Sequence, residues 1–511
     1  MVLRTSEQRQ RWQPTAADLT AVLGERWVEG SGPLYEKLAG SLRRAVEHGY
    51  LPAGTYLPSE RLLAQALFVS RSTVVAAYRL LRAEGVLASR QGSGTWVRGR
   101  VAGTFRDEET LSILTRDPYL SSFIDASPVP IDLTVPAPRA ALESIAARGL
   151  LADVGAELLR EATPLGYQAR GLPSFRRAVA RYLHARGLPT SEDDILITSG
   201  GQQAISLLLS LFLRPKDEVI VENPSYRGLI DALLFARARV LPVAIDDPNL
   251  PSWLHDLATT QAPRLVYLTP TCHNPTGFTL GPETRREVVR VAAKLGVPIV
   301  EDTVLADLSL EEPPSYLASY AKRPSSVIVI GSLSKAIWGG LRVGWIRASS
   351  PIISRLARLK ALTDLGTSAV SQIVALELMT NIEPILQVQR DEVRTSLALM
   401  EDLLGVHAPD WTWRRPSGGR SVWIRLPQGK SKDLAQLALM YGVALSAGST
   451  LSFDESFEDY LRLPFVHPPE IMREGCRRLG DAWTSYVACS SYERITSDAK
   501  KSMTACYTNE R

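Results

Sequence analysis

The residues most able to do chemistry in this chain surround one lysine. Lys335 follows Ser332 and Ser334, and Arg342 lies seven residues further on. An amine in this setting can form a Schiff base with a carbonyl group, while the hydroxyls and the guanidinium bind an anion. Upstream, Asn274 opens an Asn-Pro-Thr-Gly turn. Together these parts suit a pocket for pyridoxal phosphate (PLP).

A PLP pocket also needs a phosphate cradle, a ring over the pyridine, an acid at the ring nitrogen and a donor to the phenolic oxygen. Residues 199–202 follow the apolar stretch 195–198 and open a helical pattern, so the N–H groups around Gly201 and Gln202 can hold a phosphate. Tyr226 can stack on the ring, Asn274 can donate to the phenolic oxygen, and Asp302 can pair with a protonated ring nitrogen. The order of these residues along the chain favours a PLP site more than any one of them does.

Simpler interpretations exist for single residues. Tyr226 can be a core aromatic, and Arg462 can be the partner of a structural ion pair. His273 has no second ligand at a spacing typical of metal sites, and none of the four cysteines forms a Cys-x-x-Cys pair. We therefore expect no metal and no disulfide scaffold.

A second functional region precedes this pocket. Apolar residues at four-residue spacing predict a helix between Pro33 and Gly49, Ser59 is placed to cap a second helix, and Ser70 caps a third that runs from Arg71 to about Glu84. In the second helix we expect Leu62, Leu63, Ala66 and Leu67 to face inward. Two short strands, 86–88 and 94–97, then flank a glycine-containing hairpin tip. The pattern is that of a winged helix-turn-helix.

Charge supports a nucleic-acid role for this region. Residues 33–98 hold nine Lys and Arg against four Glu and no Asp, a local charge of +5 in a chain whose net charge is only +4. We expect Arg71, Ser72 and Thr73 to meet base edges, Arg61 to hold a phosphate, and Arg90, beside Gly92, to enter a minor groove. The alternative is that these charges simply solvate a helix face.

The remaining sequence divides by pattern. Residues 1–32 form a lead-in, 33–98 the winged helix-turn-helix domain, 99–130 a linker, 131–490 a PLP-binding domain and 491–511 a loose tail. Strand-like and helix-like stretches alternate after Ile131, which predicts an α/β fold with a mostly parallel sheet and a smaller subdomain from about Glu383 to Val487. No apolar run reaches about 18 residues and the first residues carry no secretory signal, so we expect a cytoplasmic protein without a membrane span.

These motifs identify a resemblance. Residues 131–487 resemble a fold-type I aminotransferase domain, and the whole chain is similar to the MocR (GabR-like) branch of the GntR regulators, whose heads resemble residues 57–61 and 70–74. The resemblance implies Lys335 as the Schiff-base lysine, Asp302 and Asn274 as partners of the ring nitrogen and phenolic oxygen, and Tyr226 as the stacking ring. It implies Gly201, Gln202, Ser332, Ser334 and Arg342 around the phosphate, and Arg462 as the clamp for a ligand carboxylate.

One position departs from the family pattern. The family commonly has a tyrosine two residues after the ring aspartate, whereas this chain has Val304. The missing phenol would help to hold the phenolic oxygen of PLP. We therefore expect weak or absent transamination.

Two main hypotheses follow. The first is a PLP-dependent transcription regulator in which a homodimer binds double-stranded operator DNA and senses an amine, an amino acid or PLP. The second is a working aminotransferase with an N-terminal accessory domain. A third, weaker hypothesis is a DNA-binding protein whose large domain has lost its cofactor.

Overall fold

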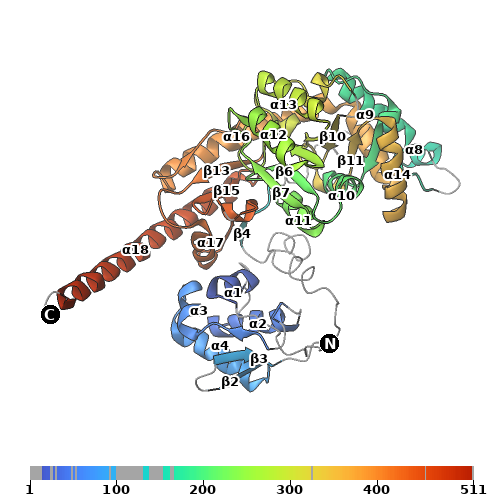
Figure 1. The fold of residues 1–511 in the computed structure, drawn as a ribbon. Coiled ribbons are helices and arrows are strands. Elements are labelled where there is room, and N and C mark those ends of the chain that lie inside the picture. Colours follow the sequence, from blue (N-terminus) through green and yellow to red (C-terminus); the bar gives the residue numbers. More distant parts are fainter. Residues whose placement is uncertain are drawn as a thin grey trace, which may run out of the picture. The chain divides into compact units, whose positions relative to one another are not determined.

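The computed structural model describes residues 14–23, 27–28, 32–47, 50–51, 54–90, 94–98, 130–136, 154–161, 166–323, 326–454 and 456–508. The side chains of residues 489–508 lie outside this description. The chain forms two compact units (Figure 1). The first contains residues 1–134, 429–445 and 475–511, and the second contains residues 135–428 and 446–474. The predicted linker 99–130 lies almost entirely outside the described residues.

The N-terminal part of the first unit is a helical bundle with a small sheet. Helices α2 (Leu34–Glu47), α3 (Glu60–Ala66) and α4 (Arg71–Ala83) precede strands β2 (Leu87–Arg90) and β3 (Gly94–Val97). β3 pairs antiparallel with β2 on one side and with β1 (Tyr56–Leu57) on the other. Ser59 and Ser70 cap α3 and α4 by accepting from backbone N–H groups, as their positions predict. The three predicted helices and the wing are therefore confirmed.

Two details of this region differ from the prediction. Leu62 was expected inside but is 55% exposed, because α3 buries Leu63 and Ala64 together with Leu67 just beyond its end, which places Leu62 on the opposite side. Within the predicted lead-in, residues 16–23 form helix α1 (Ala16–Leu23), whose Leu19 joins the core of α2 and α4. Eight residues are too few for an apolar period to stand out, so tertiary packing decides that this helix forms.

The second unit is built around a seven-stranded sheet. Its strands are β5 (Ile195–Thr198), β6 (Glu218–Glu222), β7 (Arg239–Val243), β8 (Leu265–Leu268), β9 (Ile299–Asp302), β10 (Val327–Ser332) and β11 (Gly344–Arg347), in the order β5-β11-β10-β9-β8-β6-β7. Only β11 runs antiparallel to its neighbours. The predicted mostly parallel sheet is therefore confirmed.

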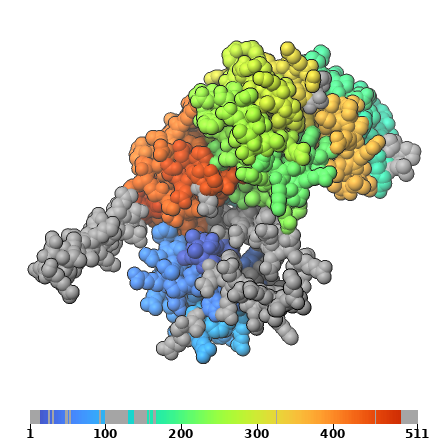
Figure 2. Space-filling model, viewed as in Figure 1, coloured from blue at the N-terminus to red at the C-terminus, as the bar shows by residue number. Residues whose placement is uncertain are grey.

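Helices cover both faces of this sheet (Figure 1). One apolar cluster joins the sheet to α9 (Pro173–Ala185), α12 (Leu250–Gln261), α13 (Pro282–Leu295) and α15 (Ala369–Thr380), with α8 (Val154–Glu161) beside it. The other joins it to α10 (Gly201–Phe212), α11 (Arg227–Phe235) and α14 (Ser350–Thr363). Helices α12 and α13 lie on the outer surface in the view of Figure 2.

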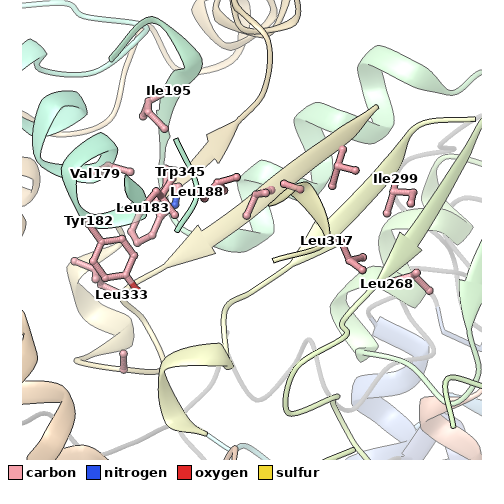
Figure 3. Packing of buried hydrophobic residues seen from close by; sticks show 14 of the residues in the cluster. Val179, Tyr182, Leu183, Leu188, Ile195, Leu268, Ile299, Leu317, Leu333 and Trp345 are labelled. Atoms are coloured by element: carbon pink, nitrogen blue, oxygen red, sulfur yellow. The ribbon is translucent and has the colours of Figure 1, made fainter. Parts of the chain in front are cut away.

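The strands alternate between the two clusters. Val327 and Val329 pack into the first cluster while Ile328 and Ile330 pack into the second. In the first cluster, Figure 3 shows Tyr182 and Leu183 of α9 beside Trp345 of β11. Continuous apolar strands of this kind need helices on both faces of the sheet. The ends of the strands are therefore the part of the sheet that is left open for function.

The smaller region of the second unit is antiparallel. Strand β13 (Ser421–Arg425) pairs with β12 (Thr412–Trp413) and with β15 (Tyr460–Pro464), and β15 pairs with the end of β14 (Val443–Ala447). The long helix α16 (Ile382–His407) precedes these strands. In the first unit, residues 443–445 of β14 pair in parallel with β4 (Ile131–Leu133), and α17 (Ser431–Met440) lies between β13 and β14 in the sequence.

The C-terminal segment corrects a prediction. Helix α18 (Pro469–Thr508) includes residues 491–508, where the sequence analysis expects a loose tail. No glycine or proline occurs between Asp481 and Thr508, so nothing in the sequence ends the helix. Polarity alone was a poor guide to its conformation.

Among the described helices, one bent pair, α15 with α16, passes a test of length and composition for crossing a membrane. Within the described ranges, no single helix is both long and apolar enough to do so.

Candidate functional site

The six parallel strands of the large sheet have their carboxyl ends on the same side, and predicted site residues follow five of these ends. Ser199 follows β5, Tyr226 lies four residues after β6, Asn274 follows β8, Asp302 ends β9 and Ser332 ends β10. Ligands of open parallel sheets bind outside the carboxyl ends of the strands. The topology therefore gathers residues that lie far apart in the sequence.

The predicted phosphate cradle lies at the start of α10. Gly200 has a φ of 93°, and a Cβ there would lie 3.0 Å from Nη2 of Arg342. That nitrogen donates to the carbonyl oxygen of Ser199 at 2.6 Å. The structure thus brings Arg342 to the helix N-terminus, where N–H groups and the helix dipole favour an anion.

The two serines join the same place. The hydroxyls of Ser332 and Ser334 lie 2.9 Å apart, and Ser332 also donates to the carbonyl oxygen of Val343. A Cβ on Gly201 would lie 4.0 Å from Cβ of Ser332 and 3.3 Å from a methyl carbon of Val304. Side chains from the ends of β9 and β10 therefore border the cradle.

Asp302 is buried and accepts two hydrogen bonds. Tyr267 donates its hydroxyl to Oδ2 at 2.6 Å, and the N–H of Val304 donates to Oδ1 at 2.9 Å. Burial raises the pKa of Asp302, the two hydrogen bonds oppose that rise, and the nearby Glu222 adds to it. None of the described groups that act on this carboxylate is a cation. The carboxylate is therefore available to form an ion pair with a protonated ring nitrogen.

Lys335 is the centre of the site. Its amine donates to the carbonyl oxygen of Pro136 at 2.9 Å. Burial, and after it the positive charges of Arg462 and Arg420, lower the pKa of Lys335 to about 8. A lysine with this pKa is partly neutral near pH 7, which is the form that attacks a carbonyl carbon.

The two arginines lie on the small-region side of the pocket. Arg462 is buried in β15, and its guanidinium lies 3.5 Å from the side-chain oxygen of Asn274 and 3.3 Å from the hydroxyl of Ser446. Arg420 is 3% exposed, and its Nη2 donates to the backbone oxygen of Lys335. The structure thus brings Arg462 next to Asn274, and the charge of Arg462 acts on Lys335.

The remaining predicted residues flank this group. Tyr226 is half-buried at the start of α11, where a Cβ on Gly228 would lie 2.6 Å from its hydroxyl. Gln202 is exposed and donates to the carbonyl oxygen of Gly228. His273 is buried, with its ring bonded to Thr276 and 3.3 Å from Glu222, in keeping with a structural role.

The predicted DNA-contacting residues that the structure describes all belong to the first unit. Arg61, Arg71, Ser72 and Arg90 are exposed, and the hydroxyls of Ser72 and Thr73 bond to that of the cap residue Ser70. Arg61 lies in α3, Arg71 begins α4 and Arg90 ends β2. Gly92 lies outside the described residues.

Sequence reasoning missed three residues of the PLP pocket: Tyr267, Arg420 and Pro136. Tyr267 lies in the predicted strand 264–268, but residues 265–268 are all apolar and buried, so the sequence does not show which face of the sheet its side chain is on. Pro136 and Arg420 gave no signal either, because they meet Lys335 only through the folded chain.

Three features suit PLP. The cradle has glycines where a side chain would collide, the acid at the end of β9 has no cationic partner among the described groups that act on it, and the lysine amine is held below its ordinary pKa. These are the requirements for phosphate, ring nitrogen and aldehyde carbon, respectively.

Both the large domain and the N-terminal domain match known protein families. Residues 150–479 match the family "Aminotransferase class I and II", and residues 34–97 match "Bacterial regulatory proteins, gntR family". The HTH-type transcriptional regulator YdfD of Bacillus subtilis, itself uncharacterised, is 30% identical over 470 residues, which is 88% of this chain and 96% of the relative. The 2-aminoadipate transaminase of Thermus thermophilus is 30% identical over 407 residues, which is 76% of this chain and 96% of the relative.

Solved structures agree for the large domain. The α-aminoadipate aminotransferase LysN of Thermus thermophilus, in complex with N-(5'-phosphopyridoxyl)-L-leucine, aligns with a TM-score of 0.65 at 28% identity, covering 73% of this chain and 98% of LysN. A kynurenine aminotransferase of Pyrococcus horikoshii aligns with the same TM-score at 27% identity, covering 72% and 94%.

The lowered pKa of Lys335 predicts a pH dependence. Uptake of PLP by the cofactor-free protein needs the neutral amine, so its rate should rise with pH around a midpoint near 8. At pH 7 the neutral fraction should exceed that of an ordinary lysine by about 300-fold. Stopped-flow absorbance measures the rate. Arg420→Met removes a cation and should move the midpoint upward, whereas a midpoint above 10 in the unsubstituted protein would contradict the assigned environment.

Proposed function

This chain belongs to the aminotransferase class I and II family and carries a gntR-type DNA-binding domain, and we propose that its PLP pocket senses an amine or amino acid and thereby controls operator binding. The observation that carries the proposal is the joint presence of a capped recognition helix and a lysine pocket of the aminotransferase type in one chain. An aminotransferase has no need of a DNA recognition helix, and a simple repressor has no need of a lysine pocket of the aminotransferase type.

PLP is the cofactor of this family, with PLP-derived ligands in related structures. In our proposal the N–H groups of Gly201 and Gln202, the hydroxyls of Ser332 and Ser334 and the guanidinium of Arg342 hold the phosphate. Tyr226 stacks on the ring, Asp302 pairs with the ring nitrogen and Asn274 donates to the phenolic oxygen. When bound, PLP supplies an electron-withdrawing ring conjugated with the carbon that carries the ligand nitrogen.

The residues of the chain then govern ligand exchange. Lys335 holds the cofactor through its amine, and Arg462 binds the carboxylate of an incoming amino acid. With the cofactor bound, Lys335 would be the residue that the amine of such a ligand displaces, and the lysine side chain would then stand in the pocket as a free amine. Because its pKa is near 8 and two guanidinium groups lie close, the released amine changes both the charge and the packing of the pocket.

Such a change can act as a switch. A ligand shifts a conformational equilibrium only by its difference in affinity for the two states, and the released Lys335 amine is a group whose environment can differ between them. We propose that the two states differ in operator affinity and that the protein acts as a homodimer on a repeated or palindromic site. The DNA contacts proposed are Arg71, Ser72 and Thr73 at base edges, Arg61 at a phosphate, and Arg90 with Gly92 in the minor groove.

A working aminotransferase remains the second candidate, because Lys335, Asp302 and Arg462 are all in place. Val304 weighs against it. A valine methyl borders the cradle where the family commonly has a tyrosine, and the nearby phenol of Tyr267 is already bonded to Asp302. We therefore propose weak or absent turnover.

The regulatory proposal predicts ligand-dependent DNA binding. The PLP-loaded protein should bind DNA from upstream of its own coding region, and at least one amine or amino acid should change that affinity, typically by 5- to 150-fold. Lys335→Ala should retain the DNA-binding head but lose the response. Fluorescence anisotropy measures both. Rapid steady-state transamination together with no binding to any upstream DNA would instead establish the enzyme.

A further prediction concerns the recognition helix. Arg71→Ala should weaken operator binding by about 1–3 kcal/mol if the side chain reads a base, because a bidentate contact to a guanine contributes about that much. Unrelated DNA of the same length is the control and should lose much less affinity. An equal loss on both DNAs would make Arg71 a phosphate contact.

A further inference from the structure

We propose that the ligand sensed by this pocket is a dicarboxylic amino acid, with one carboxylate on Arg462 and the second on Arg420. This inference rests on the proposed function, because it names the ligand class of the same PLP pocket. It arises from Arg420, a residue to which neither the sequence motifs nor the resemblance assigns a role.

Arg420 is a buried cation with incomplete bonding. Both of its hydrogen bonds come from Nη2, to the backbone oxygen of Lys335 at 3.1 Å and to the side-chain oxygen of Gln389 at 2.5 Å. Its Nε is buried without a hydrogen-bond partner. Among the described residues no carboxylate forms an ion pair with it. The charge of Glu392 acts on Arg420, but Glu392 is hydrogen-bonded to Gln389 and not to the guanidinium. A buried guanidinium is costly unless an anion completes its bonding.

The backbone fixes Arg420 at the pocket. It follows Gly418 and Gly419, and a Cβ on Gly418 would lie 2.3 Å from the carbonyl oxygen of Leu308 and 2.7 Å from Sγ of Cys272. Leu308 belongs to the segment after Asp302, and Cys272 to the turn that carries Asn274. The double glycine thus lets the start of β13 approach both segments, and the arginine after it is held in one place.

The positive charges of both arginines act on the amine of Lys335. Among the residues that the structure describes, the charged groups that act on Lys335 are Arg462 and Arg420, and each lowers its pKa. Arg420 donates to the backbone oxygen of Lys335 at 3.1 Å, and the guanidinium of Arg462 lies 3.5 Å from the side-chain oxygen of Asn274, so both guanidinium groups border the pocket that holds the lysine amine. The pocket therefore has two cations for the anionic groups of one amino acid.

The chemistry of the ligand follows. Arginine presents a planar fork of donors that matches a carboxylate. Arg462 beside Asn274 suits the carboxylate next to the amino group, which leaves Arg420 for a second carboxylate on the ligand side chain. A monocarboxylic ligand would leave Arg420 without a directly bonded anion, with only the charge of Glu392 acting on it.

Stable conjugates test this without turnover. N-(5'-phosphopyridoxyl) derivatives of L-glutamate and L-aspartate should bind the cofactor-free protein more tightly than those of L-glutamine and L-asparagine, with about a 10- to 100-fold preference for at least one acid over its amide. Acid and amide differ only in the second carboxylate. Isothermal titration calorimetry in the absence of DNA gives the four dissociation constants.

Variants show which residue causes the preference for acid over amide conjugates. Arg420→Met should reduce the acid-to-amide ratio to about one, while Arg420→Lys, which keeps the positive charge, should retain part of it. Arg462→Met is the matched control: it should weaken acid and amide conjugates by similar factors and leave their ratio largely unchanged. Binding of the amide conjugates to Arg420→Met verifies that this variant folds and keeps its cofactor site.

Three outcomes would overturn the inference. The unsubstituted protein could show no preference for either acid. Arg420→Met could weaken acid and amide equally, which would mean that Arg420 serves the cofactor, the first carboxylate or the fold. Arg420→Met could also keep the full preference. None of these results depends on operator binding, so the ligand class and the regulatory role can fail separately.

Discussion

The chemistry of this pocket depends on the burial of positive charge around the amine of Lys335. Lys335, Arg420 and Arg462 lie in a single pocket, and no anion among the described groups acts on the lysine. Desolvation and mutual repulsion keep the pKa of Lys335 near 8, which keeps part of the amine neutral and nucleophilic. The same repulsion makes the pocket favourable for a ligand that brings negative charge. Reactivity and selectivity thus have one physical cause.

The fold creates this arrangement through the parallel sheet. Because the six parallel strands have their carboxyl ends on the same side, the segments that follow five of them supply the cradle, the stacking ring, the ring acid, the asparagine and the lysine to a common place. The antiparallel strands β13 and β15 then contribute the two arginines. Glycines at 200 and 418 permit the close approaches that a side chain would prevent. Apolar packing on both sheet faces keeps these backbone positions fixed.

Local signals in the sequence predicted much of this. Ser59 and Ser70 are capping residues whose effect depends only on their neighbours, and the cradle residues 199–202 lie between a strand and a helix that both have clear patterns. Arg420 could not be predicted in this way, since it meets Lys335 across 85 residues of sequence. Leu62 was placed wrongly because a short helix with several leucines does not define one apolar face. The helical conformation of residues 491–508 was missed because this stretch is mostly polar and its few apolar residues follow no clear period.

Covalent attachment at Lys335 is the most direct test of the account. The purified protein is saturated with PLP, reduced with borohydride, digested and mapped by mass spectrometry, with Lys335→Ala treated in parallel. The account predicts a pyridoxyl group on Lys335 in the unsubstituted protein and none on the corresponding peptide of the variant. An unmodified Lys335, or equal labelling of surface lysines in both proteins, would contradict it.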